Sequence, residues 1–189
     1  MGKPVEPGYS VEQELSEIQA SLKNPREFEK IYSRHFSTIY AYIKSATGDK
    51  NLAADLCSDV FYSALINLAK YTTSEMGIRP WLFGIAINRL RMFFRQSGRM
   101  MYVPIDDLKL QQLTEEDLSL EKKERRKQLS AYLSLLNEEE QEFVQLRFVA
   151  ECSFREIALV KGISEEACKM RLYRLLERMR KSMDKDTLL

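Results

Sequence analysis

Residues 81–95, WLFGIAINRLRMFFR, combine the apolar side chains of a buried helix with three arginines and no acidic residue. At about 100° per helical residue, the large apolar side chains fall on one broad arc that suits a core face. That core arc holds Leu82, Phe83, Ala86, Ile87, Leu90, Phe93 and Phe94. The opposite arc is formed by Trp81, Gly84, Asn88, Arg91 and Arg95. The stretch therefore predicts a helix that packs along one face and carries a second, basic face.

The basic character extends beyond this helix, because no Asp or Glu occurs anywhere from 76 to 105. Proteins bind unpaired nucleic acid with arginines for phosphates, aromatic rings for stacking and amides for base edges. The interval contains all three kinds of group, and its arginines are Arg79, Arg89, Arg91, Arg95 and Arg99. A nucleic-acid surface explains the pattern, and so does a core position for Trp81 beside solvated arginines.

The composition favours a soluble helical protein. A chain of 189 residues accommodates one medium domain or two small ones. Hydrophobic residues make up 44% of the chain and charged residues 30%, whereas seven Gly and five Pro are few for a β-rich protein, so the expected fold class is all-α. No apolar run approaches the roughly 20 residues that cross a bilayer, and no apolar signal core is present, which favours a cytoplasmic location. The net charge of +1 confines any nucleic-acid surface to part of the molecule.

Residues suited to catalysis or metal binding are scarce. Cys57, Cys152 and Cys168 are odd in number, far apart and without a CxxC pair, so neither a disulfide framework nor a zinc site follows. His35 is the only histidine, and no P-loop, GxSxG or HExxH motif occurs. We therefore expect no enzyme, no cofactor, no metal site and no small-molecule substrate. We interpret Cys168 as a buried packing residue.

Further helices are expected before the 81–95 stretch. Residues 1–22 form a tail with a short helix. Residues 28–47 have helical apolar spacing, follow an Asn-Pro pair typical of a helix start, and precede a Gly-Asp pair that ends helices. A second helix runs from about Asn51 to Tyr71. Its outward residues are Asp55, Ser58 and Asp59.

After Gly98 the character of the sequence changes. Residues 99–125 have sparse apolar periodicity, which favours a linker that is partly extended around Pro104. The acidic residues of this linker are Asp106, Asp107, Glu115, Glu116 and Asp117. A solvated linker accounts for this composition, and an acidic strand lying in a positively charged channel is the functional alternative.

The last third of the chain predicts a helix-turn-helix. Residues 137–140, NEEE, and 153–156, SFRE, both match the capping box that opens a helix. A glycine-containing turn at 161–163 follows the second of these helices, and Ser164 is placed to cap a long final helix. A short helix, a tight turn and a longer helix together indicate a helix-turn-helix.

The final helix has one apolar and one basic face. The apolar face holds Cys168, Leu172, Leu175, Leu176 and Met179. The opposite face holds Ala167, Met170, Arg171, Arg174, Arg178 and Lys181. The small Ala167 permits close approach to duplex DNA, and Arg171 and Arg174 are placed to contact base edges or phosphates. An ordinary amphipathic helix with a basic exposed face is the alternative.

Both halves resemble one family, the bacterial sigma factors of the sigma-70 type, and specifically their small extracytoplasmic-function class. In the first half, AADLCSDVF at 53–61 is similar to the family pattern AEDLxQEVF, and the 81–95 stretch resembles WLxxIAxNxxxDxxR. In the second half, LLNEEEQEFVQLRF at 135–148 is similar to LPxxxRxVFxLR, and residues 153–180 resemble the family's terminal helix-turn-helix. Departures from these patterns occur at Ala54, Ser58, Met92, Asn137 and Glu142.

The resemblance implies two small helical domains joined by an acidic linker. After an N-terminal tail at 1–22, sigma region 2 would span 23–98, the linker 99–125, and sigma region 4 126–185. Region 2 would bind the promoter −10 element as opened single strand and hold a flipped base in a pocket. The residues implied are Asn67, Tyr71, the 72–78 loop and Asn88 around the base, Trp81 in the wall, and Arg91 and Arg95 on phosphates.

The same resemblance implies the partners. Core RNA polymerase would contact Asp55, Ser58 and Asp59 through the clamp helices of its β′ subunit, and region 4 through its β flap. The acidic linker would thread the positively charged active-site path of the polymerase. An anti-sigma factor is a further partner that the family allows. In the major groove of the −35 element, region 4 would place Ala167, Lys169, Met170, Arg171 and Arg174.

Two other functions fit parts of the sequence. A stand-alone helix-turn-helix regulator explains the second half and predicts symmetric operator binding by a dimer. A sigma-like decoy or adaptor, which binds polymerase without recognising promoters, agrees with the departures at Ala54, Ser58 and Met92. Promoter-dependent initiation of transcription separates a sigma factor from both alternatives.

Overall fold

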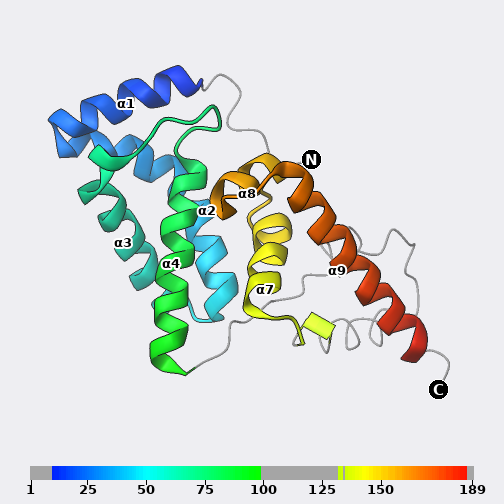
Figure 1. Ribbon diagram of the computed structural model, residues 1–189. Coiled ribbons are helices and arrows are strands. Elements are labelled where there is room, and N and C mark those ends of the chain that lie inside the picture. Colours follow the sequence, from blue (N-terminus) through cyan, green and yellow to red (C-terminus); the bar gives the residue numbers. More distant parts are fainter. Residues whose placement is uncertain (1–9, 99–131, 134, 187–189) are drawn as a thin grey trace, which may run out of the picture.

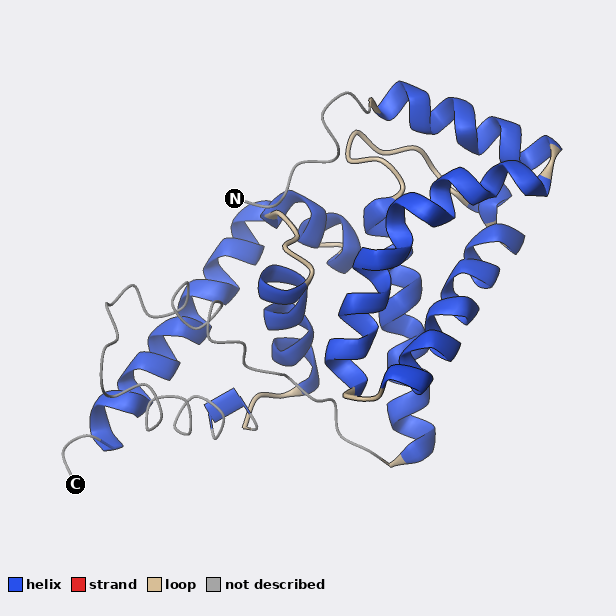
Figure 2. Cartoon of the chain, turned by 180° about the vertical axis from the view of Figure 1, so that it is seen from behind, coloured by secondary structure: helices blue, strands red, loops and turns tan. Residues whose placement is uncertain are grey.

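The computed structural model describes residues 10–98, 132–133 and 135–186 (Figure 1), so the expected linker lies outside the described residues. Every regular element in these ranges is a helix (Figure 2), which confirms the all-α class. The first half contains α1 (Val11–Lys23), η1 (Pro25–Phe28), α2 (Glu29–Thr47), α3 (Lys50–Ile66), η2 (Leu68–Lys70) and α4 (Arg79–Ser97). The second half contains α7 (Glu138–Val144), the π-helical turn η3 (Gln145–Val149), α8 (Phe154–Lys161) and α9 (Glu165–Asp186).

Side-chain caps begin the later helices where the sequence predicts them. Capping boxes open α7 at Asn137 and α8 at Ser153. The hydroxyl of Ser164 accepts the N–H of Ala167 at 3.1 Å at the start of α9. Such acceptors pair N–H groups that a helix start leaves without an internal partner. Gly162 ends α8 in the left-handed conformation, with φ of +64°, and so allows the tight turn of the helix-turn-helix.

The second long helix ends earlier than the sequence predicts. We expect it to reach Tyr71, but α3 ends at Ile66 and a 3₁₀ turn follows. The backbone N–H and the side-chain Nδ2 of Asn67 both donate to the carbonyl of Ser63, at 3.2 and 2.9 Å. A side-chain amide that competes for a backbone carbonyl is typical of a helix end. Tyr71 consequently lies at the start of the loop to α4 rather than on a helix.

Helices α2, α3 and α4 pack side by side, and α1 crosses one end of this bundle (Figure 1). Tyr42 and Phe83 are fully buried at its centre and meet edge to face, with ring centroids 5.2 Å apart. The predicted core arc of α4 is confirmed for Leu82, Phe83, Ala86, Ile87 and Leu90. Phe93 and Phe94 pack against the core as well, but they are only half-buried.

The second half packs directly on the first, with α8 against α4 and η3 against α2. Leu146 and Ile157 are fully buried in the same apolar cluster as the residues of the α2–α4 bundle. A smaller cluster holds α9 to α7 and consists of Leu133, Leu136, Val144, Leu175 and Met179. The described halves therefore form one packed body.

Residues 76–105 contain no acid, and glutamates of the second half form ion pairs with two of their arginines. The guanidinium of Arg79 donates to the carboxylate of Glu156. Arg91 donates from Nε and Nη2 to Oε1 and Oε2 of Glu142, at 2.5 and 2.8 Å. Lys161 donates to the same carboxylate of Glu142, whose side chain is fully buried. The second half therefore neutralises the charges of two arginines of α4. Glu142 departs from the family pattern, and its pairing with Arg91 and Lys161 explains why an acid stands there.

We expect Glu142→Gln to weaken the packing of the second half on the first. The amide keeps the volume of the side chain but removes the charge that pairs with Arg91 and Lys161, at a cost of about 3–5 kcal/mol in the free energy of unfolding. Urea titration measures this loss, and small-angle scattering detects separation of the halves. Glu75→Gln is the matched control, because the Glu75–Arg155 pair is exposed and contributes less than about 1 kcal/mol. Equal losses in both variants would contradict a special role for the buried carboxylate.

Candidate nucleic-acid interface

The outer face of α4 carries most of the predicted single-strand site. Asn88, Arg91 and Arg95 are exposed along it, as the helical wheel predicts. Trp81 is half-buried and packs against Tyr71, with ring centroids 5.4 Å apart and planes inclined by 53°. Trp81 thus packs against the core while part of its ring is exposed, and its role in binding nucleic acid stays a prediction.

Asn67 and Tyr71 carry polar groups just after the end of α3, and the ring of Tyr71 lies against Trp81 of α4. The Nδ2 of Asn67 donates to the carbonyl of Ser63, and its Oδ1 accepts from Lys70 Nζ at 3.0 Å. The hydroxyl of Tyr71 accepts the N–H of Ser74 at 3.4 Å. Burial raises the pKa of the Tyr71 hydroxyl, which is protonated at neutral pH even at its ordinary value and can donate a hydrogen bond. The predicted pocket residues therefore present hydrogen-bonding groups and a tilted pair of aromatic rings in contact.

The 72–78 loop connects these groups to α4 and is internally hydrogen-bonded. Ser74 Oγ donates to the carbonyl of Gly77 at 3.0 Å and accepts the N–H of Met76 at 3.3 Å. Gly77 has φ of +68°, which a residue with a Cβ rarely adopts. The Ile78 N–H, at the end of the loop, donates to Oε2 of Glu14 in α1 at 2.6 Å.

Sequence reasoning missed Glu14. Its side chain is buried against the loop, although acidic residues on short terminal helices are usually solvated. The spacing of Glu14, Ile18 and Ser21 on one inward stripe of α1 is the pattern that could have revealed it, because a lone acid there must find a buried partner.

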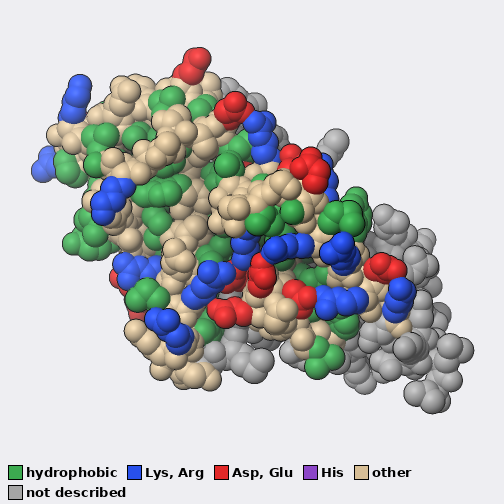
Figure 3. All heavy atoms as spheres, viewed as in Figure 1, with side chains coloured by type: hydrophobic (Ala, Val, Ile, Leu, Met, Phe, Trp, Pro, Cys, Tyr) green, Lys and Arg blue, Asp and Glu red, His purple; other side chains and the backbone are tan. Residues whose placement is uncertain are grey.

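The two predicted phosphate-binding arginines of α4 stand in different environments. Arg95 is exposed in the last turn. Arg91 is about half-exposed, and its hydrogen bonds to Glu142 raise its pKa. Figure 3 shows Lys and Arg side chains interleaved with Asp and Glu over the face that α4, α7 and α9 share. The basic surface expected from the sequence is thus partly covered by acids of the second half.

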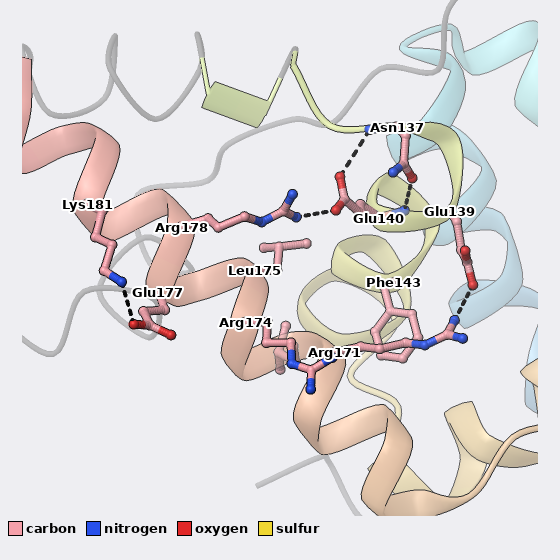
Figure 4. Close-up of a pocket in the computed structure, with 11 residues that line it drawn as sticks. Asn137, Glu139, Glu140, Phe143, Arg171, Arg174, Leu175, Glu177, Arg178 and Lys181 are labelled. Carbon is pink, nitrogen blue, oxygen red and sulfur yellow. Dashed lines mark hydrogen bonds and ion pairs between the residues drawn. The ribbon is translucent and has the colours of Figure 1, made fainter.

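The predicted duplex-reading residues lie on α9. Met170, Arg171 and Arg174 are exposed, whereas Ala167 and Lys169 are half-exposed. A groove of about 500 Å³ separates α9 from α7 (Figure 4). Across it, the guanidinium groups of Arg171 and Arg178 meet the carboxylates of Glu139 and Glu140, respectively. Lys169 pairs along its own helix with Glu165 at 2.7 Å. The basic face predicted for the final helix is present and partly neutralised.

The predicted polymerase-binding residues Asp55, Ser58 and Asp59 are all exposed on α3. Two apolar side chains that sequence reasoning missed continue the same helical face, with Tyr62 64% exposed and Ile66 59% exposed. Their spacing of three and seven residues from Asp59 was the available indication. An exposed aromatic and a β-branched residue beside two carboxylates form a surface suited to a protein partner.

The cysteines and the remaining acids form no further site in the described part of the chain. Burial raises the pKa of Cys57 and of Cys152 to about 12, so these thiols stay protonated and unreactive. Cys168 is fully buried, as expected for a packing residue. Among the described residues, no group of three or more His, Cys, Asp or Glu could hold a metal ion. None of the described helices combines the length and apolar character needed to span a membrane.

The helix-turn-helix and the acid-free face of α4 together place the chain among helical DNA-binding proteins. Comparison of the sequence with models of known protein families identifies the family within this class. The family model for sigma-70 region 2 matches residues 31–100, and that for sigma-70 region 4 matches residues 126–179. The chain belongs to the sigma-70 family of bacterial RNA polymerase sigma factors, within its extracytoplasmic-function (ECF) class. It is accordingly a promoter-recognising subunit for transcription initiation.

Individual relatives agree with this assignment. The RNA polymerase sigma factor CarQ of Myxococcus xanthus is 31% identical over 156 residues, which cover 81% of this chain and 87% of CarQ. The ECF RNA polymerase sigma factor SigM of Bacillus subtilis is 26% identical over 152 residues, covering 80% of this chain and 92% of SigM.

Two solved structures share the fold. CnrH in complex with the cytosolic domain of CnrY gives a TM-score of 0.61 at 21% identity, with 92% of this chain and 97% of that chain covered. RpoE of Bartonella quintana, in complex with the anti-sigma factor NepR, gives 0.57 at 18% identity, with 84% and 98% covered. The order of helices described above is therefore that of known sigma factors.

Proposed function

We propose that this sigma factor recognises the −10 element as single strand on the outer face of α4, and the −35 element as duplex through α9. In this proposal region 2 spans 23–98, the linker 99–125 and region 4 126–185. The observation that carries it is the exposed row of Asn88, Arg91 and Arg95 beside the contacting aromatic rings of Tyr71 and Trp81. Amide, guanidinium and aromatic groups in one row match an unpaired strand.

The −10 pocket would hold one base that has left the DNA stack. Extrusion of a base costs a few kcal/mol, and stacking on an aromatic side chain contributes about 1–3 kcal/mol. Tyr71 and Trp81 provide that aromatic surface, and the amides of Asn67 and Asn88 provide groups for a base edge. Asn67 exchanges its local partners, Ser63 and Lys70, for the base when it takes part.

Phosphate binding on α4 requires a change of partners. Arg95 is exposed and accessible to a phosphate. Arg91 is held by Glu142 of the second half, so a phosphate binds there only after that carboxylate moves away. Guanidinium groups bind carboxylate and phosphate in the same bidentate manner, which makes this exchange chemically direct. Movement of the second half away from α4 therefore accompanies DNA binding.

The −35 element would be contacted by the exposed face of α9. Arg171 and Arg174 are placed for base edges or phosphates, and the half-exposed Ala167 lets the helix lie deep in the major groove. Lys169 and Met170 complete this surface. Arg171 must leave Glu139 before it reaches the DNA.

Core polymerase would supply the additional affinity for promoter DNA that the isolated chain lacks. The net charge of +1 makes affinity for free DNA weak, because that affinity follows the number of phosphates neutralised. The exposed face of α3, with Asp55, Ser58, Asp59, Tyr62 and Ile66, would bind the clamp helices of the β′ subunit, and region 4 would bind the β flap. Once both domains are attached, each weak DNA contact becomes intramolecular and gains effective concentration.

An anti-sigma factor is a further partner in this proposal. The solved relatives CnrH and RpoE are each bound to a second protein, CnrY and the anti-sigma factor NepR, respectively. The site of action would be the cytoplasm, where core polymerase and promoter DNA are found. The chain would perform no bond chemistry of its own and would act by binding and by stabilising opened DNA.

Transcription from genomic DNA tests the proposed function directly. Purified protein is mixed with core RNA polymerase and fragmented DNA of the source organism, and the 5′ ends of the transcripts are sequenced. New start sites that share two upstream motifs, absent with core polymerase alone, are the expected result. Polymerase binding without new starts would indicate a decoy, and absence of binding would indicate a stand-alone regulator.

Asn88→Ala is expected to reduce open-complex formation about tenfold or more, because one good hydrogen-bonded base contact contributes about 1–3 kcal/mol. Polymerase binding should stay unchanged, since Asn88 is exposed on α4 and lies away from the α3 face. Permanganate footprinting measures opening, and a binding titration with core polymerase measures assembly. Gln96→Ala, which removes an exposed amide from the last turn of α4, is the control. Parallel loss of opening and polymerase binding would assign Asn88 a structural role.

Arg171→Ala combined with Arg174→Ala is expected to weaken −35-dependent promoters by about 10- to 100-fold. Promoters that rely on the −10 element should change much less. Initiation rates on matched promoters with intact and scrambled −35 elements measure this difference. The control removes two exposed cations of the first half, Lys23→Ala with Lys50→Ala, for an equal change in net charge. If both pairs had the same effect, recognition of the −35 element would have to lie elsewhere.

A further inference from the structure

Helix α1 lies outside residues 31–100, which the region 2 family model matches, yet it packs onto the candidate −10 site. Figure 1 shows α1 crossing the end of the bundle beside the loop that joins α3 to α4. The inward stripe of α1 consists of Glu14, Ile18 and Ser21, all buried. Burying a carboxylate costs free energy of folding unless the group is hydrogen-bonded. The hydrogen-bond partners of Glu14 therefore indicate which parts of the molecule α1 holds in place.

The carboxylate of Glu14 is shared between two elements of the first half. Its Oε2 accepts the N–H of Ile78 at 2.6 Å. Its Oε1 lies 3.2 Å from Nε2 of His35 on α2. Glu14 is 4% exposed and His35 is 7% exposed, so both contacts are shielded from water. The acid thus joins the end of the 72–78 loop to the bundle through α1.

Glu14 also acts as the missing cap of α4. Ile78 is the residue before the first turn of α4, and an isoleucine side chain cannot accept a hydrogen bond from the turn. A helix start presents N–H groups and a partial positive charge, and a carboxylate there is favourable on both counts. The acid that supplies this interaction belongs to α1, so the docking of α1 determines whether the start of α4 has its hydrogen-bond acceptor.

Gly77 fits the same carboxylate closely. A Cβ at Gly77 would collide with Oε2 of Glu14, and the backbone there has φ of +68°. The backbone of the loop at Gly77 therefore lies directly against the Glu14 carboxylate. At its other end the loop is held by Tyr71, whose hydroxyl accepts the Ser74 N–H. Tyr71 and Glu14 are thus the two anchors of a loop that lines the proposed base pocket.

We propose that Glu14 is a positioning residue for −10 base recognition, and that α1 is part of the promoter-reading unit. By fixing the 72–78 loop and the first turn of α4, the carboxylate holds Tyr71, Trp81 and Asn88 in one arrangement around the extruded base. Glu14 contacts no DNA itself. This inference rests on the proposed function, because it concerns how tightly the −10 pocket selects its base.

The test compares Glu14→Gln with wild type in holoenzyme assembled from the full chain and core polymerase. Initiation is measured on promoters that carry each of the four bases at the extruded −10 position, and 2-aminopurine fluorescence at that position reports extrusion. Glu14→Gln removes the charge that binds the Ile78 N–H, and discrimination between the best and the worst base should fall about tenfold. Polymerase binding and dependence on the −35 element should stay at wild-type values.

Glu17→Gln is the matched control on the same helix. Glu17 accepts both guanidinium nitrogens of Arg34, at 2.7 and 3.0 Å, so it ties α1 to α2. This variant should keep wild-type base discrimination even if α1 docks less firmly. Equal, uniform losses on all four promoters in both variants would overturn the proposal, because α1 would then have only a general structural role.

A second variant keeps the inference testable if Glu14→Gln folds poorly. Gly77→Ala leaves α1 intact and pushes the Glu14 carboxylate away from the Ile78 N–H. The same loss of base discrimination is expected, together with faster hydrogen exchange at the Ile78 amide. Retention of discrimination despite faster exchange would overturn the proposal. If wild-type holoenzyme initiated at no promoter, the proposed function itself would fail, which is a distinct result.

Discussion

The buried carboxylate of Glu142 is the constraint on which the arrangement of the two halves depends. It is fully buried on α7 and accepts hydrogen bonds from Arg91 on α4 and Lys161 on α8. A buried charge is tolerated only when it is paired, so these three helices must meet where the carboxylate lies. Arg79 and Glu156 add a second tie between α4 and α8. Helix α4 is thereby fixed against α7 and α8.

This arrangement places carboxylates where the proposed function requires phosphates. Arg91 is paired with Glu142, and Arg171 is paired with Glu139. One candidate DNA-binding arginine in each half therefore already has a carboxylate partner within the protein. Carboxylate and phosphate compete for the same guanidinium geometry. A chain with a net charge of +1 thus holds a local excess of arginine without strong non-specific attraction to DNA. In the proposed function, polymerase and promoter together separate the pairs that the isolated molecule forms.

Local features of this structure were predictable from the sequence, and long-range ones were not. The caps at Asn137 and Ser153 and the apolar face of α4 depend on residues within a few positions of one another, so spacing alone predicts them. The pairing of Arg91 with Glu142, 51 residues away, leaves no periodic pattern. The inward stripe of α1 could have indicated that Glu14 is buried, but not that its partner is Ile78, which is 64 residues distant. The candidates on α4 and on α9 were found because each set shares one helix face, whereas Asn67 and Tyr71 came from the family resemblance.

The apolar core that both halves share also bears on how the chain is synthesised. Ile31 of α2 and Ile157 of α8 belong to one cluster, so the bundle is not fully covered until α8 has formed. A ribosome adds about 5–20 residues per second. For several seconds after α4 is complete, the α2–α4 face that meets α8 and η3 therefore faces water on the nascent chain. A message truncated in this interval yields a product with a persistent apolar surface, which chaperones and proteases recognise.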